Sequence, residues 1–129
     1  MTWKARITLI RDMPAGHGIS YGRTFITPRE MRVATLSVGY ADGYPRHLSN
    51  RDAPVIVRGQ RCPLLGRVTM DLMMIDVSHI DGVEVGDEVV LLGRQIGEEI
   101  SATELADRAN TISWEIVTRI GRRVRRVYV

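Results

Sequence analysis

Three segments of the sequence combine glycine with aromatic, basic or acidic residues, which are the residue types that a binding or catalytic site requires. They are residues 15–22 (AGHGISYG), 37–46 (SVGYADGYPR) and 65–71 (LGRVTMD). Glycine lets a loop take unusual backbone shapes, and flanking strands can hold such a loop rigid while its amides and polar side chains face a ligand. We therefore expect the chemistry of this chain in these segments. A plain connection between strands is the alternative for each.

Other familiar kinds of site find little support in the sequence. The three histidines lie about 30 residues apart and the single cysteine, Cys62, has no partner at ligand spacing, so no metal site is expected. The glycines of the first segment are not followed by the Gly-Lys-Ser/Thr of a phosphate-binding loop. Asp71 and Asp76 are five positions apart, which on a regular strand puts them on opposite faces. We therefore do not expect a catalytic carboxylate pair.

The segments between these loops have the pattern of β-strands. Short runs rich in Val, Ile, Leu, Met and Thr, separated by turn residues, cover residues 6–10, 32–38, 55–58, 68–77 and 88–92. Residues 58–60 (RGQ) join two apolar runs, as a hairpin turn would. Evenly spaced short strands are typical of a closed sheet. We predict a mainly β fold, a single β-barrel-like domain over residues 1–129 with about seven strands and one or two short helices near the C-terminus.

The helical signals come late in the chain. Ser101 and Glu104 form a capping box, in which the hydroxyl and the carboxylate each accept a hydrogen bond from a free backbone amide, so a helix is predicted over residues 102–109. Isoleucines at positions 112, 116 and 120 recur at helical spacing and predict a second short helix. Residues 123–129 (RVRRVYV) alternate basic and apolar residues, which predicts a last strand with one solvated face.

Composition and charge narrow the class of protein. With 129 residues, 44% of them hydrophobic, the chain suits one soluble globular domain. It has no apolar run of membrane-spanning length and no signal peptide at its start, so we expect a cytoplasmic protein that does not contact a membrane. The formal net charge is +3, and much of the excess lies in four arginines between positions 122 and 126. The chain has few aromatic residues and no helix-turn-helix or zinc-finger pattern, so nucleic acid is not expected as a partner.

The three glycine-containing segments, in this order and spacing, closely resemble the C-terminal domain of the alanine racemase family. The resemblance covers nearly the whole chain and continues through residues 85–87, 92–94, 111–115 and 123–129. It implies a mostly β domain that, in a homodimer, covers the mouth of a pyridoxal 5'-phosphate-binding barrel of the partner subunit. The barrel comes earlier in the polypeptide and is absent from this sequence. The implied activity interconverts L-alanine and D-alanine for peptidoglycan precursor supply.

The resemblance also assigns a proton carrier. Racemisation removes the α-proton from one face of alanine and returns a proton on the other, so it needs two acid/base groups. By resemblance, Tyr21 is one of them and the Schiff-base lysine of the barrel is the other. The only lysine here, Lys4, lies outside any matching motif. A phenol ordinarily titrates at about 10, so the family's chemistry implies activation of Tyr21 by nearby positive charge or by the reacting carbon.

Further site residues follow from the same resemblance. Met70 matches the position whose backbone amide meets the substrate carboxylate. Tyr40, Arg46 and Arg67 match residues that line the access corridor, and for Arg67 a structural salt bridge is the alternative. Trp114 stands where well-known members of the family have a tyrosine that contacts the cofactor phosphate. At position 125 this chain has arginine where the family usually has proline.

Two other functions stay open at this point. A racemase for serine or another amino acid would use the same chemistry, because side-chain selectivity is set partly in the barrel. A non-catalytic β-barrel module that binds a partner would share the fold. Because the barrel is not in this sequence, we expect the isolated chain to be inactive, to lack covalently bound cofactor and to self-associate weakly through the apolar surface that would meet a barrel. A longer gene that encodes an upstream barrel would separate these functions.

Overall fold

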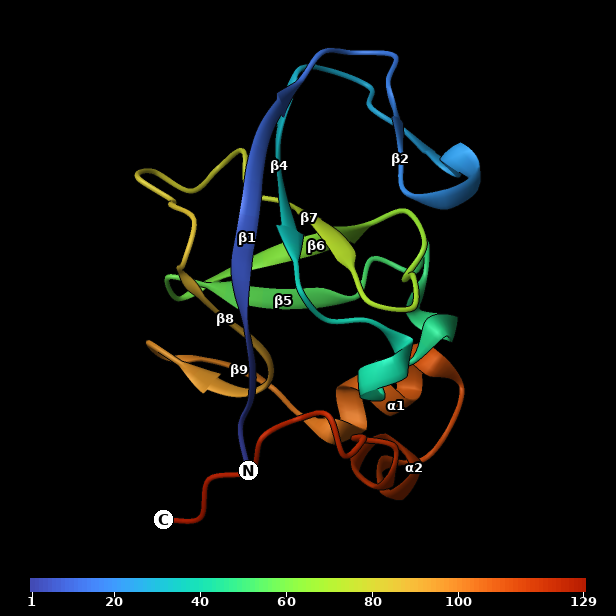
Figure 1. Cartoon of the computed structure of the whole chain (residues 1–129), viewed down its shortest axis with the longest axis vertical. Helices are drawn as coiled ribbons and strands as arrows, with labels where there is room; N and C mark the ends of the chain where they lie inside the picture. The colour runs from blue at the N-terminus through green and yellow to red at the C-terminus, as the bar shows by residue number, and fades with distance from the viewer.

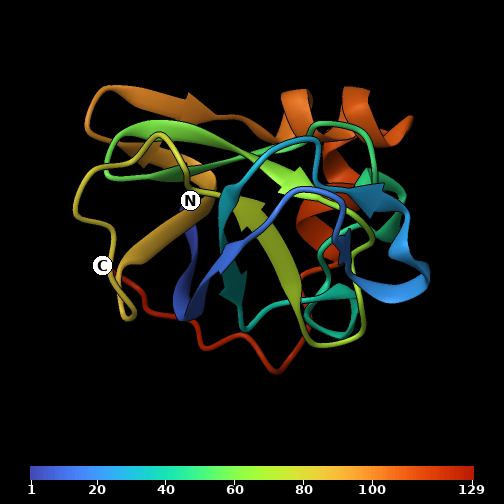
Figure 2. The same cartoon turned by 90° about the horizontal axis from the view of Figure 1, so that it is seen from above.

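The computed structural model describes all 129 residues and is built on one antiparallel sheet of seven strands. The strands, in their order across the sheet, are β1 (Trp3–Met13), β4 (Met31–Leu36), β7 (Met73–Asp76), β6 (Gln60–Leu65), β5 (Pro54–Val57), β8 (Glu88–Gln95) and β9 (Glu98–Ile100). Because β1 also pairs with β8, all but β9 close into a ring, which Figure 1 shows from the side and Figure 2 from above. The prediction of a mainly β domain with about seven strands is confirmed.

The ring closes through β1, which changes partner along its length. Residues 3–6 pair with β8, and residues 7–13 pair with β4. The register shifts between Ile7 and Leu9, an irregularity that bends a strand and increases its local twist. One long strand can therefore belong to both sides of the ring, and Figure 1 shows it running along the long axis of the molecule.

The interior of the ring is an aliphatic core. It comprises 28 buried residues, mainly Val, Ile, Leu and Ala, with Trp3 and Tyr44 in contact at a ring separation of 6.0 Å. A second cluster of four buried residues, Ile19, Met31, Val33 and Leu65, lies beneath a small two-stranded ribbon. The ribbon consists of β2 (Gly18–Ile19) and β3 (Phe25–Ile26) and was missed in the sequence. Packing of Ile19 into this cluster anchors the ribbon to the ring.

Two α-helices and three single turns of 3-10 helix complete the fold. The helices, α1 (Ala102–Ala109) and α2 (Ser113–Thr118), lie at the end of the molecule where both termini also lie (Figure 1). The prediction of residues 102–109 is confirmed, and Ser101 Oγ accepts a hydrogen bond of 3.0 Å from the Glu104 amide. The Glu104 carboxylate instead accepts hydrogen bonds from Arg61, so the second half of the capping box is not formed. No helix is long and apolar enough to cross a membrane.

Two strand predictions are wrong in part or entirely. Within residues 68–77 only β7 is a strand, because Thr69 bonds to Leu72 through both its amide and its hydroxyl and turns the chain. The last strand predicted over 123–129 does not form. Arg126 instead binds the backbone of the preceding turn: its guanidinium donates to the carbonyls of Ile120, Gly121 and Val124. The segment is closed on its own turn by these bonds and pairs with no strand of the sheet.

Candidate functional site

The three glycine-containing segments meet around the loop of residues 66–72. Ser20, from the first segment, donates a hydrogen bond of 2.6 Å from its hydroxyl to the Arg67 carbonyl. Tyr40 and Ala41, from the second segment, donate from their amides to the carbonyls of Thr69 and Met70, each at 3.0 Å. The fold therefore brings together segments that are far apart in the sequence, as expected for parts of one site.

Tyr21 occupies the tip of the β2–β3 ribbon, in the 3-10 turn η1 (Tyr21–Arg23). Its side chain is 73% exposed, and the Arg67 guanidinium lies over its ring at 5.9 Å from the centroid. This is a cation–π contact, which holds the ring without using its hydroxyl. The preceding Ser20 has a left-handed backbone, with φ 65°, a strained conformation for a residue other than glycine. The hydrogen bond from Ser20 to the loop keeps this turn in place.

Met70 lies at the tip of the neighbouring loop, with its backbone amide free. The amide donates no hydrogen bond within the chain, and the residue is 54% exposed. The loop behind it is fixed by the two hydrogen bonds from the 3-10 turn η2 (Tyr40–Asp42). Gly39 permits this close approach, because a Cβ there would lie 2.5 Å from the Met70 carbonyl carbon. A rigid loop therefore presents an unpaired N–H donor to any ligand that covers it.

The residues expected in an access corridor lie on the second and third glycine-containing segments. Tyr40 begins η2 and is partly exposed, and Arg46 begins the 3-10 turn η3 (Arg46–Leu48) with an exposed side chain. The Arg67 guanidinium forms its contact with Tyr21 and no ion pair with a carboxylate, so the structural salt bridge considered for it is not formed. A cation without a carboxylate partner is available to a negatively charged ligand group.

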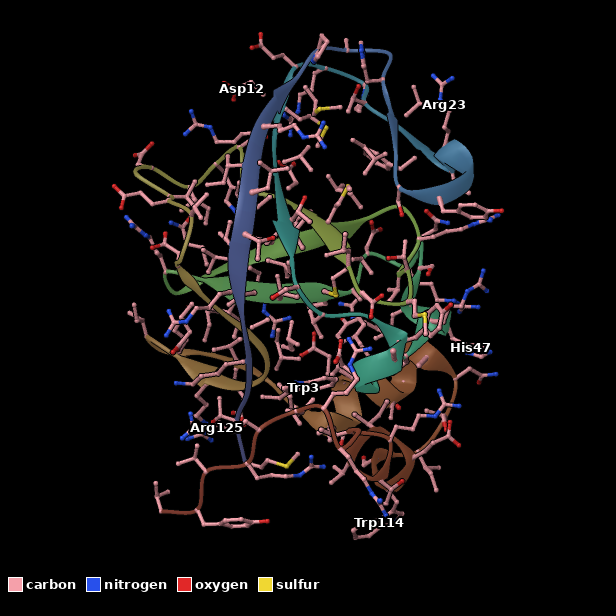
Figure 3. The ribbon with its side chains drawn as sticks, in the orientation of Figure 1. Trp3, Asp12, Arg23, His47, Trp114 and Arg125 are labelled. Carbon is pink, nitrogen blue, oxygen red and sulfur yellow. The ribbon has the colours of Figure 1, made fainter.

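Trp114 is not part of this cluster. It lies on α2 with its side chain 78% exposed, beside a cavity of about 380 Å³ that Asp107 and Ile112 also line. Figure 3 shows Trp114 at one end of the long axis and Arg23, which belongs to the same turn as Tyr21, toward the other end. Tyr21 and Trp114 therefore cannot contact the same small molecule.

Arg123 is a site residue that the sequence analysis missed. Its Nε lies 3.1 Å from Asp42 Oδ1, and its Nη2 lies 2.8 Å from Asp71 Oδ1. The hydrogen bond to Asp71, together with the negative charges of Asp42 and Asp71, raises the pKa of the Arg123 guanidinium. The available signal was charge: the second and third segments each carry an aspartate, and the surplus arginines are in the tail. Spacing alone did not indicate that these residues meet.

Other reactive groups lie outside the cluster or are engaged. Cys62 is buried, and burial raises the pKa of its thiol to about 12, which keeps it protonated. Asp71 is held by Arg123, whereas Asp76 binds Arg29 and Ser78, so the two aspartates do not form a pair. The ammonium group of Lys4 forms an ion pair of 3.0 Å with Glu88 between β1 and β8. No group of three or more His, Cys, Asp or Glu residues is placed to hold a metal ion.

Comparison with known proteins assigns the family. The sequence model for "Alanine racemase, C-terminal domain" matches residues 1–128. The chain belongs to this family. The alanine racemase of Symbiobacterium thermophilum is 62% identical over 128 residues, which is 99% of this chain and 34% of that protein. The chain thus spans about a third of the length of the curated alanine racemases that it matches.

Solved structures of alanine racemases have the same fold in their corresponding part. The Bacillus anthracis alanine racemase, with bound L-Ala-P, superposes with a TM-score of 0.89 at 43% identity, over 95% of this chain and 31% of that one. The Bartonella henselae alanine racemase, with covalently bound pyridoxal phosphate, superposes with a TM-score of 0.90 at 34% identity, over 99% and 34%. The fold that the family resemblance implied is confirmed.

Proposed function

We propose that this chain is the C-terminal domain of an alanine racemase and gives a proton-carrying tyrosine, Tyr21, and a carboxylate-binding amide, that of Met70, to a site shared with a barrel domain. The proposal rests on one observation: neither of these two groups is hydrogen-bonded to another group of the chain. The Tyr21 hydroxyl and the Met70 amide have no partner within the chain, yet both stand on loops that are fixed by hydrogen bonds. Loops built in this way are prepared for a ligand from outside the domain.

Tyr21 would exchange a proton with the α-carbon of alanine on one face. Its exposure lets the hydroxyl reach into a neighbouring domain, while the Arg67 stack and the Ser20 hydrogen bond restrict where the ring can point. Restriction matters because a proton carrier acts only within hydrogen-bond reach of the proton that it moves. The Arg67 guanidinium lies over the ring and leaves the hydroxyl without a partner in this chain, so the hydroxyl is free to meet a substrate.

The Met70 amide would bind the substrate carboxylate, with Tyr40, Arg46 and Arg67 along the corridor that leads to it. An N–H donor and unpaired guanidinium groups suit the carboxylate of a small amino acid. Four large hydrophobic residues on or near the two loops, Ile26, Tyr40, Met70 and Leu72, are between 41% and 54% exposed. Exposed apolar groups around polar ones support a surface that another domain covers, here the barrel of the partner subunit in a homodimer.

The residues of this chain fit a cofactor that is held elsewhere. Covalent attachment of pyridoxal 5'-phosphate needs a lysine, and Lys4 is engaged with Glu88 and outside the cluster. The lysine must therefore come from the barrel, and we expect the isolated chain to hold no cofactor covalently. When bound there, the cofactor supplies the electron sink that makes the α-proton of alanine removable. The bound pyridoxal phosphate of the B. henselae relative supports this assignment.

Trp114 fits the proposal only if it contacts the cofactor in a site other than the one that Tyr21 serves. Since Trp114 lies far along the long axis from Arg23, which shares the turn of Tyr21, its indole N–H would donate to the cofactor phosphate of a different barrel from the one that Tyr21 serves. A homodimer offers two such barrels. A cytoplasmic enzyme of this kind would supply D-alanine for peptidoglycan precursors, and alanine as the substrate is supported by relatives at 62% and 56% identity that are named alanine racemases.

A chimera tests this proposal. It joins the part of the S. thermophilum alanine racemase that precedes the matched region to this chain, which is 62% identical to the domain it replaces. We expect the chimera to racemise alanine in the presence of pyridoxal phosphate, and the 129-residue chain alone to show no turnover. A chimera that folds and binds the cofactor, yet does not racemise alanine, would overturn the proposal.

A further inference from the structure

The C-terminal segment links the two loops that carry Tyr40 and Met70. The Arg123 guanidinium reaches Asp42 with its Nε and Asp71 with its Nη2, at 3.1 and 2.8 Å. Asp42 ends η2, and Asp71 directly follows Met70. One side chain from the end of the chain therefore bridges the second and third glycine-containing segments.

The Asp42 side of this bridge is rigid. The Asp42 side chain is only 11% exposed, its Oδ2 accepts a hydrogen bond of 2.9 Å from the Gly39 amide, and its carbonyl accepts one of 2.8 Å from the Gly121 amide. The turn that aims Arg123 is itself closed by Arg126, which donates to the carbonyls of Ile120 and Gly121. Asp42 is thus a fixed anchor for the Arg123 guanidinium.

The Asp71 side is the one that can move. The Asp71 side chain is 56% exposed and binds Arg123. Without Arg123 the two carboxylates would face each other as like charges with no cation between them, which disfavours their approach. The tip of the loop would then keep its backbone hydrogen bonds from Tyr40 and Ala41 and the Thr69–Leu72 turn, but would lose its one ion pair to the rest of the domain.

We infer that Arg123 is a positioning residue, which sets the place of the Met70 amide by clamping Asp71 to the fixed Asp42. This inference rests on the proposed function, because it concerns the amide that would bind the substrate carboxylate. Arg123 touches neither substrate nor cofactor in this scheme. Its loss displaces the binding amide and leaves Tyr21, which is held by Arg67 and Ser20, where it was.

The first test uses substrate affinity in the chimera. Arg123→Ala should raise the KM for alanine by about tenfold, the scale of a weakened hydrogen bond to a charged group, with kcat changed much less. Propionate, which has the carboxylate of alanine but no amine, should lose inhibitory affinity in parallel. Arg123→Lys should restore part of both values. Arg122→Ala is the matched control, because Arg122 precedes Arg123 in the same tail and makes no ion pair.

A thermodynamic cycle separates the clamp from general stabilisation. Asp71→Asn and Arg123→Ala should each raise the KM, and the double variant should be no worse than either alone, because both break the same link. A fall in thermal stability with an unchanged KM and an unchanged inhibition constant for propionate would overturn the inference. So would additive effects of the two substitutions.

The isolated chain provides a readout that does not depend on racemase activity. Arg123→Ala should accelerate hydrogen exchange of the Tyr40 and Ala41 amides, which donate to Thr69 and Met70, relative to the wild type and to Arg122→Ala. If these amides exchange at wild-type rates, the clamp does not exist. If they exchange faster while the wild-type chimera fails to racemise alanine, the clamp stands and the proposed function fails.

Discussion

Substitution of Gly39 by alanine should separate the two loops that build the site. Gly39 has an extended backbone, with φ −152°, that any residue can adopt, so the substitution carries no conformational cost. The added methyl group would lie 2.5 Å from the Met70 carbonyl carbon and closer still to the carbonyl oxygens of Thr69 and Met70. All three atoms belong to the backbone and cannot rotate away. The cost is therefore purely steric.

The size of the effect follows from these contacts. Because a Cβ does not approach such atoms within 3.0 Å, the loops must move apart by about 0.5 Å or more. The hydrogen bonds from Tyr40 and Ala41, now 3.0 Å long, would reach the limit of useful geometry. Steric overlap of this kind costs about 1–3 kcal/mol, and two weakened hydrogen bonds add about 1 kcal/mol. We expect Gly39→Ala to lower the free energy of unfolding by about 2–4 kcal/mol.

Urea denaturation of the 129-residue chain measures this free energy. Gly121→Ala is the matched control: its methyl group would lie 3.3 Å from the Ala41 carbonyl, on the other side of the same turn, and should cost less than about 1 kcal/mol. In the chimera, displacement of the Met70 amide should also reduce kcat/KM by about tenfold to a hundredfold. If the two variants unfolded at the same urea concentration, the close approach of Gly39 to the Met70 loop would be refuted.

Three further predictions concern buried or charged groups outside the loops. The Tyr44 hydroxyl is buried without a hydrogen-bond partner, and burial raises the pKa of its phenol, so Tyr44→Phe should stabilise the chain by about 1 kcal/mol in urea denaturation; destabilisation would show an undetected partner. The hydrogen bond from Arg61 lowers the pKa of Glu104 below its ordinary value of 4.5, so the stabilisation is present above that pH and is lost as the pH falls through the lower folded-state pKa. The thermal midpoint of the wild type should therefore fall as the pH is lowered, and Glu104→Gln should make this fall smaller. An equal fall in both proteins would contradict the Arg61–Glu104 ion pair. The Cys62 thiol, with its pKa raised to about 12, should resist a thiol reagent at pH 8 until the chain unfolds; rapid reaction in the folded state would contradict its burial.

Local signals in the sequence predicted much of this structure. The helix of residues 102–109 has the predicted bounds, because its start is set by the Ser101 cap and its end by Asn110 in a left-handed conformation. The loops around Tyr21 and Met70 were expected to hold the chemistry because glycine stands there beside aromatic, basic or acidic residues, and the fold brings these loops together.

Long-range contacts account for what the sequence did not predict. Residues 123–129 alternate as a strand does, yet Arg123 binds Asp71, 52 positions away, and Arg126 binds carbonyls of its own turn. These charge-assisted bonds override a weak strand preference. Trp114 matched a family position by sequence, but only the fold shows that it lies at the opposite end of the domain from the Tyr21 turn.

The most direct test of the proposed role of Tyr21 is α-proton exchange in the Tyr21→Phe variant of the chimera. The substitution removes the only titratable atom of the side chain and keeps the ring beneath Arg67, so folding and cofactor binding should persist. Racemisation should slow by about a hundredfold or more, equally in both directions because the equilibrium between the enantiomers is fixed. In deuterated water, exchange at the α-carbon should be suppressed far more for one enantiomer of alanine than for the other. Exchange rates near those of the wild type for both enantiomers would contradict the account, and Tyr21 would then be an interface aromatic without a catalytic role.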